Sequence, residues 1–248
     1  MIEEQIEIRT ADGVSDGFLV RVDDSRPRPG VIHLTDIAGI RASHREMARR
    51  LAGQGYTVLL PNVFYRTGRA PLFDFMPSMG EERTMKRFAE LAKPMTALAM
   101  ERDGGAFVDF LLSREAVTGA KIGVVDYCFT GAMALRIAAC CSDRVAAIAS
   151  FHGGGLFTDA PTSPHHLLPR VAARLYFGHA IEDRTMPEAA IEKLDRALEA
   201  WGGRFESEVY AGAHHGWTTK DAPAYAEPQA ERAFVKLCAL FAETLPGS

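Results

Sequence analysis

Short apolar runs of strand length alternate with helical patterns along most of this chain. The run GVIHLT is followed by SHREMARRLAGQG, a helical pattern that opens at a candidate cap, Ser43, and ends at glycine; a second apolar run, YTVLLPN, comes next. Such runs are typical of strands covered on both faces, and the cap and the glycine delimit a helix between them. The segment therefore predicts a strand, a crossover helix and a second strand.

The same unit recurs in the second half of the chain. KIGVVDY, VAAIASFHGGG, ARLYFGH and FESEVYAG each contain an expected strand, with helices at 129–140, 187–203 and 227–245. Residues 81–115 predict one or two helices, interrupted at Pro94 and by Gly104-Gly105. Near the N-terminus, IEIRT and DGFLVRV predict an antiparallel pair. Right-handed crossovers then give an α/β fold, a mostly parallel central sheet with helices on both faces.

Length, composition and charge narrow the classes of function. The 248 residues suit a single α/β domain spanning 1–248, and 47% apolar with 24% charged residues is ordinary for a folded protein. A formal charge of −4 offers no attraction to nucleic acid or to anionic lipid. The sequence shows neither a signal peptide nor an apolar stretch of membrane-spanning length, which predicts a cytoplasmic protein. Its oligomeric state is left open.

Neither the cysteines nor the histidines have the spacing of a metal site. The four cysteines form no CxxC pair, which indicates thiols in a reducing compartment. The histidine pairs 165–166 and 214–215 consist of adjacent residues, whose side chains point in different directions, and no HxH or HExxH spacing occurs. We expect no metal and no organic cofactor.

Cys128 lies where the strand KIGVVDY gives way to a helical pattern, FTGAMALRIAA. This is the context of a nucleophile elbow, in which the chain turns so sharply that the side chain projects from the top of the sheet. A helix N-terminus also stabilises a thiolate. The alternative is a small buried thiol in a plain turn.

A candidate acid and a candidate base follow later strands. Asp183 lies in the loop after ARLYFGH, and His214 and His215 lie in the loop after FESEVYAG. Ligands of such sheets bind beyond the carboxyl ends of the strands, and nucleophile, acid, histidine is the chain order of α/β-hydrolases. An isolated loop aspartate is usually a solvated turn residue, but three suitable residues after three strands favour a catalytic triad.

Four segments resemble the dienelactone hydrolase family, a cysteine-dependent branch of the α/β-hydrolases. They are residues 30–68, KIGVVDYCFTGAMAL, GHAIEDRTMP and YAGAHHGW, and together they extend over most of the chain. The resemblance implies an α/β-hydrolase fold and a small ester or lactone substrate. It assigns the roles of nucleophile, acid and base to Cys128, Asp183 and His215, and those of oxyanion-hole NH groups to Ile37 and Phe129.

Several residues depart from the family pattern. Asp126 and Thr130 stand where the family has glycines, and Asp126 is expected to add bulk and a negative charge near the thiolate; a helix cap or a solvated side chain is the alternative. Asp36 replaces a glutamate that contacts the resting thiol. In place of arginines that bind a substrate carboxylate, the chain offers Arg83, Arg87 and Lys220.

The hypothesis with most support is hydrolysis of an ester or lactone of a small carboxylic compound. A catalytically silent binding protein on the same scaffold is the first alternative, favoured by Asp126. The second is a redox thiol protein in which Cys128 pairs with Cys140 or Cys141.

Overall fold

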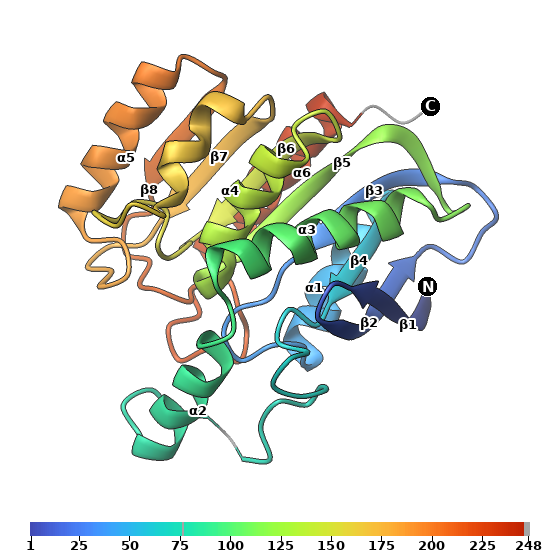
Figure 1. Ribbon diagram of the computed structural model, residues 1–248, viewed down its shortest axis with the longest axis horizontal. Coiled ribbons are helices and arrows are strands. Elements are labelled where there is room, and N and C mark those ends of the chain that lie inside the picture. The colour runs from blue at the N-terminus through green and yellow to red at the C-terminus, as the bar shows by residue number, and fades with distance from the viewer. Residues whose placement is uncertain (76, 246–248) are drawn as a thin grey trace.

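The computed structural model describes residues 1–75 and 77–245. Its centre is a twisted eight-stranded sheet in the order β1-β2-β4-β3-β5-β6-β7-β8 (Figure 1). Antiparallel pairing joins β1 to β2 and β2 to β4, and every other neighbouring pair is parallel, so the predicted mostly parallel α/β sheet is confirmed. The strands are β1 (Ile2–Thr10), β2 (Gly13–Arg21), β3 (Arg28–His33), β4 (Thr57–Pro61), β5 (Val117–Tyr127), β6 (Val145–Phe151), β7 (Arg174–His179) and β8 (Phe205–Val209).

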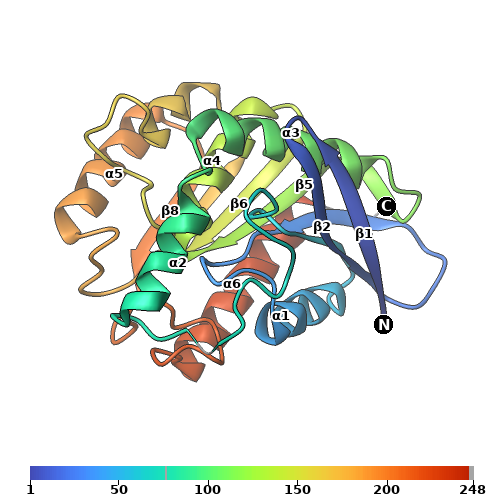
Figure 2. The same cartoon turned by 60° about the horizontal axis from the view of Figure 1, so that its bottom comes forward.

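Helices cover both faces of the sheet, as predicted (Figures 1 and 2). One face carries α3 (Ala97–Leu112), α4 (Gly131–Cys140) and α5 (Glu188–Trp201), whose apolar side chains share a buried cluster with the strands. The other face carries α1 (Ala42–Ala52) and α6 (Glu227–Thr244), which form a second buried cluster. Helix α2 (Glu82–Ala92) extends away from these layers at the bottom of Figure 1, and Leu91 near its C-terminal end belongs to the first buried cluster.

The predicted break at Gly104-Gly105 does not occur. Helix α3 runs unbroken through both glycines, whereas the chain does leave the helical path at Pro94, between α2 and α3. A Cβ atom on Gly104 would lie 2.3 Å from Cγ1 of Ile137 on α4. Gly104 is therefore where α3 and α4 approach closely, and packing between the helices outweighs the low helix propensity of glycine.

The carboxyl ends of the parallel strands meet at one edge of the sheet, where the loops after β3, β5, β7 and β8 come together. These loops carry all of the triad and oxyanion-hole residues predicted from the sequence.

No helix among the described residues has the length and apolar character needed to cross a membrane.

Candidate active site

Cys128 occupies a tight turn between β5 and α4. A single turn of 3-10 helix, Cys128–Thr130, links the two elements, and the backbone of Cys128 is left-handed, with φ of 59°. A non-glycine residue in this region is strained and is found disproportionately at functional sites. Neighbouring backbones are tightly packed, because a Cβ atom on Gly131 would lie 2.8 Å from Cα of Gly153. The turn therefore has the strained geometry expected of a nucleophile elbow.

His215 and Asp183 are in direct contact. Nδ1 of His215 lies 2.7 Å from Oδ2 of Asp183. The other oxygen of Asp183, Oδ1, accepts hydrogen bonds from the backbone NH and the hydroxyl of Thr185, both at 2.7 Å. The adjacent His214 is exposed and lies 3.8 Å from Glu182 instead. Of the two predicted candidates, His215 is therefore the one that an aspartate orients.

The electrostatic surroundings of His215 favour its protonated form. Burial alone would lower its pKa, but hydrogen bonds with Asp183 and with the thiol of Cys128, together with their charges, raise the pKa to about 10. The structure thus joins His215 to Asp183 by a 2.7 Å contact and places its imidazole close enough to the thiol of Cys128 for the two to interact. Near neutral pH the imidazolium is a proton donor beside the sulfur.

Two backbone NH groups near the elbow are free to act as donors. Ile37 lies in the turn after β3, and Phe129 is the second residue of the 3-10 turn, a position whose NH has no partner within a helix. Within the described ranges, neither NH makes a backbone hydrogen bond. Unpaired NH groups of this kind can stabilise an oxyanion.

The expected negative charge at Asp126 does not hold. Its side chain is fully buried, and Oδ1 accepts a hydrogen bond from Oγ of Ser150 at 2.8 Å. Burial raises the pKa of Asp126 well above its usual range, which favours the neutral acid. The side chain is neither solvated nor a helix cap. The observation that favoured a silent protein thereby loses its electrostatic basis.

Thr130 is accommodated without crowding. It is fully buried, and its hydroxyl lies 2.9 Å from the carbonyl oxygen of Thr35, to which it donates a hydrogen bond. Thr35 lies two residues before Ile37, in the loop after β3. A glycine at this position would have no group to make the contact, so Thr130 ties the elbow to the loop after β3.

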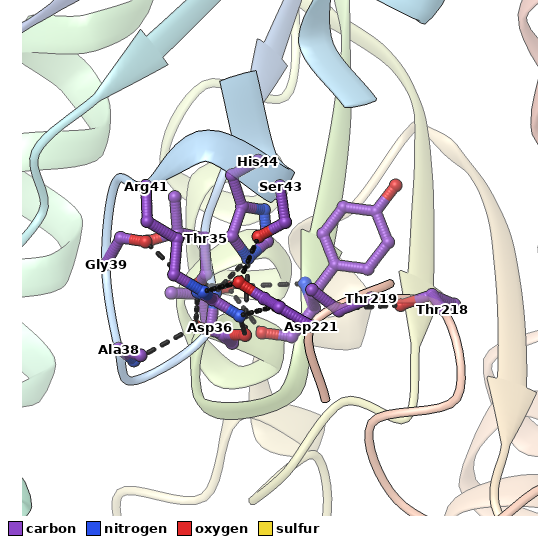
Figure 3. Close-up of polar contacts among 12 residues, drawn as sticks. Thr35, Asp36, Ala38, Gly39, Arg41, Ser43, His44, Thr218, Thr219 and Asp221 are labelled. Atoms are coloured by element: carbon purple, nitrogen blue, oxygen red, sulfur yellow. Dashed lines mark hydrogen bonds and ion pairs between the residues drawn. The ribbon is translucent and has the colours of Figure 1, made fainter. Parts of the chain in front are cut away.

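The predicted contacts of the thiol and of a substrate carboxylate are engaged elsewhere. Asp36 contacts Arg41, His44 and the NH of Ala38 rather than the thiol (Figure 3). On α2, Arg83 pairs with Glu81 at 2.8 Å, and Arg87 pairs with Glu90 at 3.0 Å. Lys220 pairs with Glu46 at 2.6 Å. Asp36 is therefore engaged by groups other than the sulfur of Cys128, and Arg83, Arg87 and Lys220, the predicted contacts of a substrate carboxylate, each already have a glutamate partner.

Sequence reasoning missed His152, which follows β6. Its ring lies edge-on to that of His215, with 5.0 Å between centroids, and Nε2 lies 2.8 Å from the hydroxyl of Thr218. Burial, and secondly the charge of nearby His215, lower the pKa of His152 to about 3, so the ring is neutral. Its position at the carboxyl end of a strand was the available signal.

Within residues 1–75 and 77–245, Cys128 is a free cysteine and has no cysteine nearby to pair with. Cys140 and Cys141 lie at the far end of α4, about 18 Å along the helix from Cys128 at about 1.5 Å per residue. Their sulfur atoms lie 3.6 Å from each other instead. In the part of the chain that the structure describes, no cluster of three or more metal-ligating side chains occurs.

Comparison with known proteins places these features in a family. The model of the "Dienelactone hydrolase family" matches residues 15–245. The chain belongs to this family. The predicted resemblance to the dienelactone hydrolases is thereby confirmed, and the chain is a hydrolase.

Individual relatives of this dienelactone hydrolase family member are distant in sequence. It is 27% identical over 218 residues to a protein of Synechocystis sp. named "Putative carboxymethylenebutenolidase", covering 86% of this chain and 85% of the other. It is 29% identical over 139 residues to the carboxymethylenebutenolidase of Pseudomonas putida, covering 56% of this chain and 57% of that protein. The crystal structure titled "Putative Dienelactone Hydrolase" from Klebsiella pneumoniae matches over 98% of both chains with a TM-score of 0.85 at 20% identity, which shows the shared α/β-hydrolase fold.

Proposed function

We propose that this chain hydrolyses an ester or lactone of a small carboxylic compound, an activity of the carboxymethylenebutenolidase type, through Cys128, His215 and Asp183. The observation that carries the proposal is the 2.7 Å contact between buried Asp183 and His215, whose imidazole also interacts with the thiol of Cys128, a residue held in a strained turn. Family membership supports a small ester or lactone as the substrate.

In the first half of the reaction, the Cys128 thiolate attacks the carbonyl carbon. The carbonyl electron pair moves to the oxygen, which the NH groups of Ile37 and Phe129 stabilise. The intermediate then collapses to an acyl-thioester as the carbon–oxygen bond breaks. The protonated His215 gives its proton to the departing alkoxide, which leaves as an alcohol, or stays attached to the acyl group when the substrate is a lactone.

In the second half, His215 acts as a base. Acylation removes the charge of the sulfur, which is one of the influences that raise the pKa of His215. A larger fraction of His215 is therefore neutral. The neutral imidazole takes a proton from water, whose oxygen adds to the thioester. Collapse of the second intermediate expels the thiolate and releases the carboxylic acid. Asp183 holds the ring in one orientation throughout.

The test is a pre-steady-state experiment with 4-nitrophenyl acetate. We expect a burst of nitrophenolate equal to the enzyme concentration, and mass spectrometry after acid quenching should locate one acetyl group on Cys128. Cys128→Ala should abolish the burst and the turnover. Cys238→Ala provides the matched control, because Cys238 is a free cysteine on α6, outside this site, and its loss should change neither.

Two results would contradict the proposal. Turnover retained by Cys128→Ala at more than a few per cent of the wild-type rate would show that another group is the nucleophile. A wild-type protein with neither a burst nor turnover across a panel of aryl esters and lactones would support a binding protein on the hydrolase scaffold.

A further inference from the structure

Arg41, directly before α1, has every one of its side-chain donors occupied. A guanidinium carries five N–H donors. Nε and Nη2 donate to the two carboxylate oxygens of Asp221 at 2.8 and 3.0 Å, and Nη1 and Nη2 donate to those of Asp36 at 2.7 and 2.8 Å. The fifth bond runs from Nη1 to the carbonyl oxygen of Gly39 at 3.2 Å. Figure 3 shows the side chain of Arg41 between these two aspartates.

This arrangement joins the two loops that the proposed reaction depends on. Asp36 directly precedes Ile37, whose NH is one of the two proposed oxyanion donors, while Asp221 lies six residues after His215. The hydroxyl of Ser43 adds a second link by donating to Asp221 at 2.9 Å. Arg41 therefore bridges the oxyanion loop after β3 to the histidine loop after β8.

The geometry and burial make this bridge stiff. The planar guanidinium makes two hydrogen bonds to each carboxylate and so fixes the orientation of both. A lysine ammonium is a single charged point on a flexible chain and cannot hold two carboxylates in this way. The side chain of Arg41 is 23% exposed and that of Asp36 13%, so solvent screens the inner pair only in part. Asp36 is held further by His44 at 3.3 Å and by the NH of Ala38 at 3.0 Å.

A direct role in binding a substrate carboxylate does not fit this residue. All five donors already have acceptors, and a bound anion would have to displace one of the aspartates. The contacts of Arg41 are with the loops on either side of the site, so its effect on the reaction has to pass through them.

We infer that Arg41 is a positioning residue that fixes the NH of Ile37 relative to His215. The NH then faces the carbonyl oxygen of the ester group while His215 gives its proton to the leaving oxygen of the same group. This inference rests on the proposed function. Removing Arg41 or its link to Asp221 lets the oxyanion loop drift, whereas the pair of Cys128 and His215 stays in place because Thr185 and Asp183 hold it independently.

The experiment compares Arg41→Lys, Arg41→Met and Asp221→Ala with Arg50→Lys. Arg50, on α1, makes a similar bidentate pair with Glu231 on α6 and, among the described residues, forms no hydrogen bond or ion pair with either loop, so it is the matched control. Asp221→Ala cuts the bridge but leaves Asp36 paired, which guards against misfolding from an uncompensated carboxylate. Three quantities are measured: kcat and KM for 4-nitrophenyl acetate, the rate of Cys128 alkylation by iodoacetamide, and the thermal unfolding midpoint.

We expect kcat to fall about tenfold to a hundredfold in Arg41→Met and Asp221→Ala, with KM within about twofold, because a displaced donor is lost mainly from the transition state. Arg41→Lys should recover little of this loss, and Arg50→Lys should match the wild type. Alkylation should stay within about twofold in all variants.

An unchanged kcat in folded Asp221→Ala would overturn the inference, and so would alkylation that falls in parallel with kcat, which would place the effect on the thiol. Absence of turnover in the wild type would refute the proposed function instead, so the two failures are distinguishable.

Discussion

At Asp126, burial overrides the charge that the residue type suggests. The side chain faces Ser150, its partner in the register between β5 and β6, and Oδ2 has no hydrogen-bond partner among the described residues. An aspartate whose pKa is raised on folding keeps its proton in the native state while the unfolded chain loses it above about pH 4. The free energy of unfolding therefore falls as pH rises from about 4 toward the folded-state pKa, by at most about 1.4 kcal/mol per pH unit for one group.

We therefore predict that Asp126→Asn becomes more stable relative to the wild type as pH rises from about 4 to about 7. Asparagine has no titratable group and still offers an oxygen that accepts the hydrogen bond from Ser150. Any other effect of the substitution on the free energy of unfolding is the same at every pH. Urea unfolding at several pH values measures the difference. Asp143→Asn, at an 85% exposed side chain, should show no comparable trend. If the free energy of unfolding of Asp126→Asn minus that of the wild type stays constant or decreases as pH rises, Asp126 is ionised in the native state.

Residue type and position in the chain indicate candidate site residues, but they do not indicate the protonation state of a buried side chain such as Asp126. Cys128, Asp183 and His215 could be picked out as candidates because their types occur at the carboxyl ends of three strands in the chain order of α/β-hydrolases. The state of Asp126 was not identifiable, because it depends on a neighbouring strand and on burial by packed helices. The choice of His215 over His214 came from the resemblance, and the geometry agrees with it.

Among the elements, α3 shows where packing between helices outweighs local propensity. The sequence predicted one or two helices over residues 81–115, with an interruption at the adjacent glycines Gly104 and Gly105. Their two environments differ: a Cβ atom on Gly104 meets Ile137 at 2.3 Å, whereas one on Gly105 meets nothing within 4 Å. A sequence pattern shows the period of a helix but not the distance to its neighbour.

This contrast predicts opposite effects for two identical substitutions. Gly104→Ala should lower the free energy of unfolding by about 1–3 kcal/mol, because the methyl group forces α3 and α4 apart or Ile137 out of its rotamer. Gly105→Ala should raise it by up to about 1 kcal/mol, because alanine loses less backbone entropy in a helix and meets no obstacle. Chemical denaturation of both variants provides the comparison, and equal effects of the same sign would contradict the close approach.

At the scale of the whole molecule, the mostly parallel sheet covered by helices on both faces was predictable, and the links between loops were not. Alternating strand and helix patterns limit the order of the sheet, because crossovers are right-handed. The contact between Arg41 and Asp221 spans 180 positions and depends on how two loops meet after the sheet has formed. Contacts between loops of this kind determine which charges surround the site, and those charges influence whether a neutral or an anionic substrate is preferred.

The cations that the sequence offered for a substrate carboxylate are already paired with protein carboxylates. Arg83, Arg87 and Lys220 contact Glu81, Glu90 and Glu46 respectively. The bridge formed by Asp36, Arg41 and Asp221 has a net charge of −1 when all three are ionised, and the chain as a whole carries −4. An anionic substrate therefore meets an unfavourable field, and to bind Arg83, Arg87 or Lys220 it has to displace an existing ion pair.

We predict that an uncharged aryl ester or lactone is turned over with a kcat/KM at least about tenfold above that of its carboxylate-bearing analogue, a difference of about 1.4 kcal/mol. Raising the ionic strength should narrow the gap, since salt screens the repulsion. Arg184, exposed beside Asp183 and without an ion-pair partner in the described chain, supplies the counter-test. If the carboxylate-bearing analogue is preferred, and Arg184→Gln abolishes that preference, Arg184 binds the carboxylate and the prediction is wrong.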